Sequence, residues 1–202
     1  MNTLELKNDK HTRADFARMK SVLACASKDS TRHVITKVLV EKTETGITII
    51  TTDGKRMRSD SFNLEAEAGI YDIKINSAKA VFLTQCEEGL VFPNYRQAIP
   101  DHTDEAAHSF TGTGSRFVLW VASSLGCYLD PKLIALADDE FVTLHIQKDN
   151  PNLFPVVLKN DQTTLVVMPY RIDKHWEQQI DAILTERVMK AMEEKETDAI
   201  AA

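Results

Sequence analysis

The sequence predicts an α+β fold, in which helices pack on one face of antiparallel sheets. Two patterns carry this prediction: runs rich in β-branched residues are separated by segments of helical periodicity, and the order of these segments recurs along the chain. The composition agrees, because 43% hydrophobic and 27% charged residues in a chain of 202 are typical of a globular protein with one domain or two small ones.

The first 62 residues are predicted to form a β-α-β-β-β unit. In the helical segment, Phe16, Met19 and Leu23 recur at steps of three and four residues. The Asp53-Gly54 pair separates the last two strands and is the strongest hairpin signal in the chain. The strand, the helix and the three further strands are expected at 3–8, 11–28, 33–42, 46–52 and 55–62.

The second half is predicted to repeat this order at reduced size. After middle strands at 71–75, 80–84, 109–112 and 117–122, the second unit is expected to consist of a strand at 127–130, a helix from Pro131 to about Asp138, and strands at 141–147, 155–159 and 164–171. The expected organisation is one domain over 1–172, with units at about 1–75 and 127–172 and intervening strands within 76–126, followed by a helical extension over 173–202.

The charges do not indicate a protein that coats nucleic acid, because the net charge is −6. Their distribution is uneven. Residues 1–40 contain eight Lys or Arg against four acids, a balance of +4, and residues 173–202 contain four bases and eight acids, a balance of −4. This polarity allows one face to lie near phosphates, but an ordinary solvated helix face explains it equally well.

Signs of catalysis or of a bound cofactor are missing from the sequence. The three cysteines are widely spaced, the six histidines are scattered, and phosphate-loop, dinucleotide, metalloprotease and nucleophile-elbow motifs are absent. We therefore expect a binding protein rather than an enzyme, with no metal and no cofactor. We also expect a cytoplasmic protein, since the sequence shows no signal peptide pattern and no apolar run of membrane-spanning length.

Three separated segments carry a resemblance to a known family. They are Arg32–Glu41 with Ile49–Met57, which contains Thr-Thr-Asp-Gly-Lys-Arg-Met, then Phe92–Pro100, which reads FPNYRQAIP, and Thr164–Ile172, which reads TLVVMPYRI. In this order they resemble the "ATDGHRL", "FPDYRRVLP" and "YVVMPMRL" segments of the bacterial DNA sliding clamp, the β subunit of DNA polymerase III. The resemblance is specific over about thirty-five residues, and it implies a DNA-clamp-like fold.

The resemblance implies a shallow apolar groove that captures short peptides of DNA polymerases and of other replication or repair proteins. Gly54 would let a peptide backbone approach, Met57 and Met168 would form adaptable walls, and Arg56 and Arg171 would hold a partner's carbonyl or carboxylate. The alternative for 166–168 is an ordinary core strand. The implied groove residues are Ile35, Thr52, Gly54, Lys55, Arg56, Met57, Pro93, Gln97, Ala98, Val166, Val167, Met168, Pro169, Tyr170, Arg171 and Ile172.

The chain also departs from the family. Clamp chains carry three such domains and close as dimers around duplex DNA, whereas this chain has about one domain's worth of residues, so a ring requires several copies or a partner. Gln97 and Lys55 replace an arginine and a histidine of the family, which puts identical peptide preference in doubt. The residues expected to face DNA, without reading its sequence, are Lys10, Arg13, Arg18 and Lys20.

Clamp chains end at the segment that Ile172 matches, so the helix expected over 173–195 is an addition. Its apolar stripe can pack on its own domain, pair with another copy or lie across the groove, and packing or self-association is favoured. The resulting prediction is a homo-oligomeric, clamp-like processivity or recruitment factor. The alternative is an adaptor, decoy or inhibitor that uses the same groove without encircling DNA.

Overall fold

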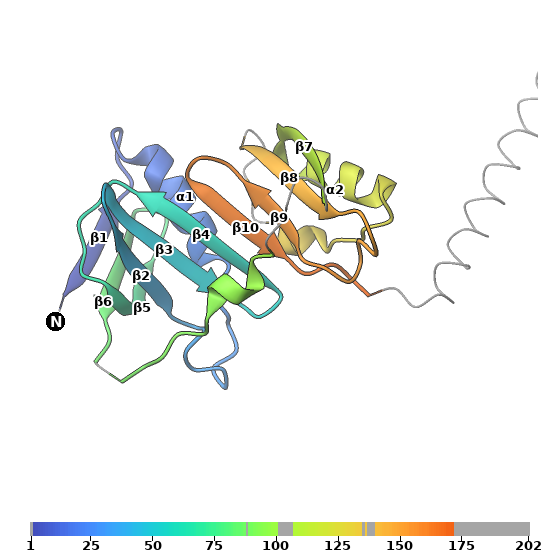
Figure 1. Cartoon of the computed structure of the whole chain (residues 1–202). Helices are drawn as coiled ribbons and strands as arrows, with labels where there is room; N and C mark the ends of the chain where they lie inside the picture. The colour runs from blue at the N-terminus through green and yellow to red at the C-terminus, as the bar shows by residue number, and fades with distance from the viewer. Residues whose placement is uncertain (1, 88, 101–106, 135, 137–139, 172–202) are drawn as a thin grey trace, which may run out of the picture. The chain divides into compact units, whose positions relative to one another are not determined.

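A computed structural model describes residues 2–87, 89–100, 107–134, 136 and 140–171 of the chain, which divides into two compact units, Met1–Tyr170 and Arg171–Ala202. The predicted C-terminal helix lies outside the described residues. The first unit contains one antiparallel sheet in the order β1-β6-β5-β2-β3-β4-β10-β9-β8-β7, shown in Figure 1. Its strands are β1 (Thr3–Lys7), β2 (Val38–Thr43), β3 (Gly46–Thr52), β4 (Arg56–Phe62), β5 (Gly69–Asn76), β6 (Ala80–Gln85), β7 (Ala107–Thr113), β8 (Phe141–Gln147), β9 (Val156–Lys159) and β10 (Thr163–Val167).

Two β-α-β-β-β units and the additional β5–β6 hairpin make up this sheet, which confirms the predicted fold class. The first unit is β1-α1-β2-β3-β4 with α1 at Arg13–Leu23, and the second is β7-α2-β8-β9-β10 with α2 at Gly114–Ser124. They join where β4 pairs with β10. The β5–β6 hairpin is inserted between β1 and β2 of the first unit, whereas β7 and β8 of the second unit pair directly.

The second unit begins about twenty residues earlier than predicted. The 117–122 segment is helical, not a strand, and the described residues of the helix predicted from Pro131 contain only a 3-10 turn at Pro131–Leu133. The strand predicted at 127–130 is also absent, since these described residues form no ladder. The apolar run Phe117–Ala122 has the composition of a strand, but only Val118, Val121 and Ala122 of it are buried, which is helical spacing.

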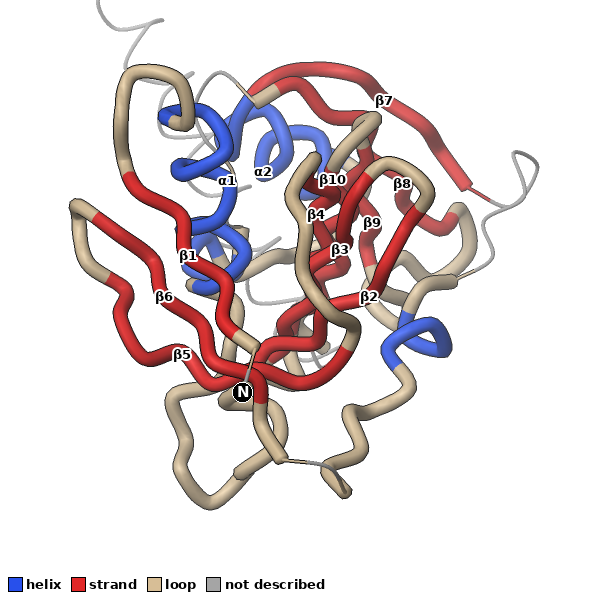
Figure 2. The backbone as a smooth tube through the Cα atoms, turned by 90° about the vertical axis from the view of Figure 1, so that its left-hand side faces the viewer, coloured by secondary structure: helices blue, strands red, loops and turns tan. Residues whose placement is uncertain are grey.

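The two helices cover the same face of the sheet. Leu165 of β10 lies opposite Arg58 of β4, and directly opposed residues share a face. Leu165 packs in the core beneath α2, while Phe62, four residues after Arg58 and therefore on its face, packs in the core beneath α1. Figure 2 shows the N-terminal strands curving round α1, with β1, β6 and β5 on one side of it and β2 to β4 on the other.

Buried charges mark the centre of this helix-covered face. Arg58 and Asp60 are both fully buried on β4, and Nε of Arg58 lies 3.0 Å from Oδ2 of Asp60. Nη2 of Arg58 also lies 3.1 Å from Oε1 of Glu140, which precedes β8, so the arginine links the two units. Burial raises the pKa of Asp60, and the Arg58 charge opposes that rise.

Candidate functional site

The uncovered face of the sheet carries a small apolar cluster at the junction of the two units. Met57 of β4 lies opposite Val166 of β10, and Val166 lies opposite Val157 of β9. Since side chains alternate along a strand, Met57 and Val166 point away from the helices. With Ile50 of β3, these four buried side chains form a cluster of their own, on which Leu39, Phe92, Tyr95 and Ile99 pack.

A cavity of about 420 Å³ opens beside this cluster. Its floor is Met57 and Val166, and exposed Met168 and Phe154 stand at its rim with 38% and 43% of their surfaces accessible. The connection that crosses the sheet after β6 supplies one wall. The lining residues are Thr52, Gly54, Lys55, Arg56, Met57, Pro93, Asn94, Tyr95, Gln97, Ala98, Pro100, Phe154, Pro155, Val166 and Met168.

The structure brings all three predicted segments to this cavity. Ten residues expected in the groove line it: Thr52, Gly54, Lys55, Arg56, Met57, Pro93, Gln97, Ala98, Val166 and Met168. Ile35, Pro169 and Tyr170 do not line it, and Val167 is fully buried in the core beneath α2. Arg171 belongs to the separate compact unit Arg171–Ala202, and Ile172 lies outside the described residues.

Five lining residues were missed by the sequence analysis. Asn94, Tyr95 and Pro100 lie inside the FPNYRQAIP segment, so this segment was the available signal for them. Phe154 and Pro155 come from the β8–β9 connection, which carries no family motif. The one available signal for these two residues was that they form a second Phe-Pro pair, after Phe92-Pro93, at the start of a predicted strand.

The β3–β4 turn shapes one end of the cavity. Gly54 has φ +86°, a backbone conformation that favours glycine because other residues are strained in it, and the Arg32 guanidinium lies directly beside this position. Oδ1 of Asp53 accepts hydrogen bonds from the backbone N–H groups of Lys55 and Arg56, at 2.9 and 3.0 Å. The N–H of Met168 donates to the carbonyl of Lys55 at 2.9 Å, which places the end of β10 beside the turn.

Arg56 has a structural role that the sequence analysis did not foresee. Its Nε donates to Asp53, its Nη2 donates to the carbonyl of Ala24 at 2.6 Å, and its Nη1 donates to the carbonyls of Lys132 and Leu133 at 3.0 and 3.2 Å. Because these bonds occupy the guanidinium, Arg56 ties the turn to both units, and it is poorly placed to hold a partner's carbonyl.

A second polar contact fixes the wall that crosses the sheet. The Tyr95 hydroxyl donates to Oε2 of Glu41 on β2 at 2.8 Å, and Nη2 of Arg96 donates to the same oxygen at 2.6 Å. The Arg96 guanidinium also lies over the Tyr95 ring, 4.8 Å from its centroid. Burial, together with the Glu41 carboxylate, raises the pKa of Tyr95 to about 12. The phenol therefore stays a donor at neutral pH.

No family model matches the sequence, and no curated protein matches it. Solved structures do match. They include the DNA polymerase III β subunit of Thermotoga maritima (TM-score 0.56, 12% identity, 86% of this chain and 66% of that one), the DNA polymerase sliding clamp of Bacillus subtilis (0.55, 11%, 85% and 64%) and the β subunit of Borrelia burgdorferi (0.54, 13%, 85% and 64%). The chain has the fold of a bacterial DNA sliding clamp.

Identities of 11% to 13% establish a shared fold and do not by themselves establish a shared function. The chain also spans just under two thirds of the length of these clamps. The predicted resemblance is nevertheless confirmed at the level of structure, over about 85% of the chain.

The helix-covered face of this clamp fold offers fewer free cations than predicted. Lys10 and Arg13 are exposed. Arg18 instead pairs with Asp15 at 2.8 Å and lies over the Phe62 ring, 4.7 Å from its centroid. Nζ of Lys20 donates to the backbone carbonyls of Asn76, at the end of β5, and of Ser77, at 3.3 and 3.2 Å. Two of the four predicted cations therefore hold the protein's own structure together.

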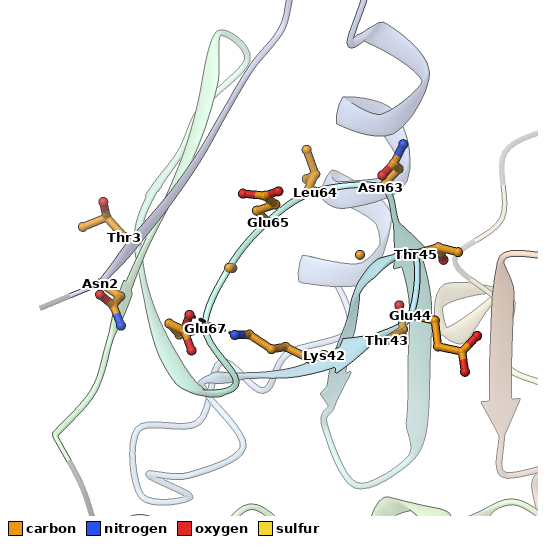
Figure 3. A pocket seen from close by; sticks show the side chains of 12 residues that line it. Asn2, Thr3, Lys42, Thr43, Glu44, Thr45, Asn63, Leu64, Glu65 and Glu67 are labelled. Carbon is orange, nitrogen blue, oxygen red and sulfur yellow. Dashed lines mark hydrogen bonds and ion pairs between the residues drawn. The ribbon is translucent and has the colours of Figure 1, made fainter.

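Other cavities of the clamp fold have a different character. One of about 1130 Å³ lies between the start of β1, the β2–β3 turn and the β4–β5 connection, and Figure 3 shows its polar lining, with Nζ of Lys42 2.9 Å from Oε1 of Glu67. Among the described residues, no group of His, Cys, Asp or Glu is arranged to hold a metal ion. A search of the same residues finds no helix with the length and apolarity needed to cross a membrane.

Proposed function

We propose that this chain is a clamp-like, non-catalytic factor of DNA replication that docks short peptides of DNA polymerases or other replication and repair proteins. The observation that carries the proposal is the convergence of three distant segments on one apolar cavity, with Met57, Pro93 and Met168 in its lining. An open apolar cavity with few polar groups fits a peptide that inserts one or two large side chains.

The exposed apolar residues support this site. Phe154 and Met168 stand at the rim, and Leu153, beside Phe154, is 51% exposed. Val91, which is 82% exposed, lines a neighbouring cavity that shares Pro93 and Tyr95 with this one. Exposed apolar side chains gathered in one region typically mark a surface that binds a partner.

A labelled peptide of the Gln-Leu-x-Leu-Phe type tests the groove. Met168→Ala combined with Phe154→Ala removes both rim side chains, and we expect at least a tenfold loss of affinity, because such anchors supply most of the binding energy at about 2 kcal/mol each. The matched control is Phe141→Ala, which removes an aromatic side chain that is 59% exposed and does not line the cavity. Equal affinity of the two variants would disprove the groove assignment.

Met57→Ala is a poor test of this site. Met57 is only 3% exposed and belongs to the apolar cluster under the groove, so truncating it should lower stability by about 2 kcal/mol or more. The rim variants are therefore the better test, because they change exposed side chains and not the cluster beneath the groove.

Duplex DNA contact and self-association belong to the same proposal. Lys10 and Arg13 can contact phosphates without reading sequence. Within the described part of the chain, β7 pairs only with β8, and its seven residues contain no proline, lysine or arginine to block a further strand. The test is solution mass with and without DNA, and retention on circular but not on linearised DNA. A ring-sized particle retained on circles supports encirclement.

The alternative is a cytoplasmic adaptor, decoy or inhibitor that uses the groove without encircling DNA. The intramolecular contacts of Arg18 and Lys20 favour it, because they leave the helix-covered face with fewer cations for phosphates. A monomer or plain dimer that binds the peptide but is not retained on circular DNA would identify this function.

A further inference from the structure

Helix α2 carries the most exposed aromatic side chain among the described residues. Trp120 is 71% exposed, while Val118, Val121 and Ala122 of the same helix are buried against the sheet. Leaving an indole ring in water forfeits a large gain from burial, since aromatic side chains bury 150–250 Å² each. The Trp120 ring is therefore accessible to a ligand.

The surroundings of Trp120 distinguish between kinds of partner. One helical turn before it lies exposed Arg116, and one turn after it lie Ser123 and Ser124. A protein interface would group several apolar side chains here. Instead, Trp120 is the one exposed large apolar side chain of α2, and it lies beside a cation on a helix that contains no acidic residue. The serine hydroxyls donate to carbonyls of the helix itself, at 3.0 and 2.8 Å, so Arg116 supplies the charge of this face.

An exposed aromatic ring next to an arginine is the arrangement that proteins use to hold single-stranded nucleic acid. The ring stacks on a base of any identity, and the cation contacts the adjoining phosphate. Duplex bases are already stacked on each other and offer an indole little surface. Arg116 forms no ion pair with any described residue, so its guanidinium is available for a phosphate.

We infer that α2 is a binding site for single-stranded nucleic acid, in which Trp120 stacks on a base and Arg116 contacts the backbone. The site lies on the helix-covered face of the sheet, with exposed Arg13 of α1 on the same face, and the apolar groove opens on the opposite face. It therefore extends beyond the peptide-docking function, and each can fail without the other.

Tryptophan fluorescence tests this site directly. The chain has two tryptophans, so Trp176→Phe leaves Trp120 as the only one. Titration of this full-length variant with a thymidine oligonucleotide should give saturable quenching that weakens as salt is raised. In parallel, anisotropy of a labelled oligonucleotide should show at least about fivefold weaker binding by Trp120→Ala, since stacking contributes roughly 1–3 kcal/mol per base.

Two further variants complete the experiment. Arg116→Ala should weaken oligonucleotide binding and reduce its dependence on salt, whereas Phe141→Ala, which removes an exposed aromatic ring from the opposite face, should leave both unchanged. Unchanged Trp120 fluorescence, or equal affinity of Trp120→Ala and the wild type, overturns the inference. Quenching that follows protein concentration without oligonucleotide also overturns it, because it would assign Trp120 to a contact between copies.

Discussion

The two faces of the central sheet use their polar and apolar residues in opposite ways. On the helix-covered face, α1 and α2 close two large apolar cores, and charged Arg58 and Asp60 are fully buried between them. On the other face, the apolar cluster has only four buried members and stays partly open to solvent. Stability therefore depends mainly on the helix-covered face, and the open face is available for a partner.

The same contrast applies to the charged side chains. Three residues that were expected to contact a ligand instead make contacts within the protein. They are Arg18, Lys20 and Arg56. A sequence motif identifies a position in the fold, but the contacts at that position decide whether the charge is free.

The largest expected effect is on stability, from the buried charges of the helix-covered face. Asp60→Ala removes a fully buried carboxylate that pairs with the fully buried Arg58 guanidinium, and we expect a loss of roughly 3 kcal/mol in the free energy of unfolding. Urea denaturation measures this loss. The control is Asp161→Ala in the exposed β9–β10 turn, which should change stability by about 0.5 kcal/mol or less. Equal losses would contradict the account.

A smaller effect is expected on the open face. Tyr95→Phe removes the hydroxyl that holds the groove wall to Glu41, and it should cost about 1 kcal/mol and weaken peptide binding a few-fold. Because the folded pKa of Tyr95 is raised to about 12 from 10.0, the contribution of the phenol is complete below pH 10 and is lost as the pH rises through about 12.

The stability difference between Tyr95→Phe and the wild type should therefore stay constant across neutral pH. Tyr170→Phe provides the comparison, since its hydroxyl donates to Asp130 at 3.0 Å from a side chain that is 55% exposed. We expect its loss to be smaller, and thermal melts at several pH values would show this. If Tyr95→Phe had the stability and the peptide affinity of the wild type, the Tyr95–Glu41 hydrogen bond would not be what holds the groove wall in place.

The smallest effect separates the two arginines of α1. Arg13→Ala should reduce the slope of log affinity for duplex DNA against log salt by about 0.9, the value of one phosphate contact. Arg18→Ala should leave this slope unchanged and cost about 1 kcal/mol of stability, because Arg18 covers Phe62 and pairs with Asp15. An identical change of slope in both variants would show that Arg18 is free in solution.

Local sequence signals predicted which segments meet at the cavity on the open face. The Asp53-Gly54 turn, the proline-framed Phe92–Pro100 segment and the 164–168 run each carry a strong backbone preference, and all three contribute to the cavity. These segments lie on short strands and tight turns, whose geometry follows from glycine, proline and alternation. The fold class was predicted for the same reason.

The second unit was misplaced because its helix has the composition of a strand. In the sequence, Phe117–Ala122 is an unbroken apolar run, which is compatible with a buried strand or with a helix, and the helical spacing of its buried positions emerges only when the segment packs against β7 and β8. The contacts of Arg56 with Ala24 and Lys132 span 32 and 76 positions of the chain. Contacts between such distant positions leave no local pattern in the sequence.

Methionine methyl NMR tests the central claim most directly, because methionines lie on both faces. Met57 and Met168 line the groove, and Met19 is fully buried beneath the helix-covered face. On titration with the Gln-Leu-x-Leu-Phe peptide, the methyl signals of Met57 and Met168 should shift progressively and saturate together, while that of Met19 stays in place. A saturable shift at Met19 with Met57 and Met168 unmoved would place the peptide elsewhere and contradict the account.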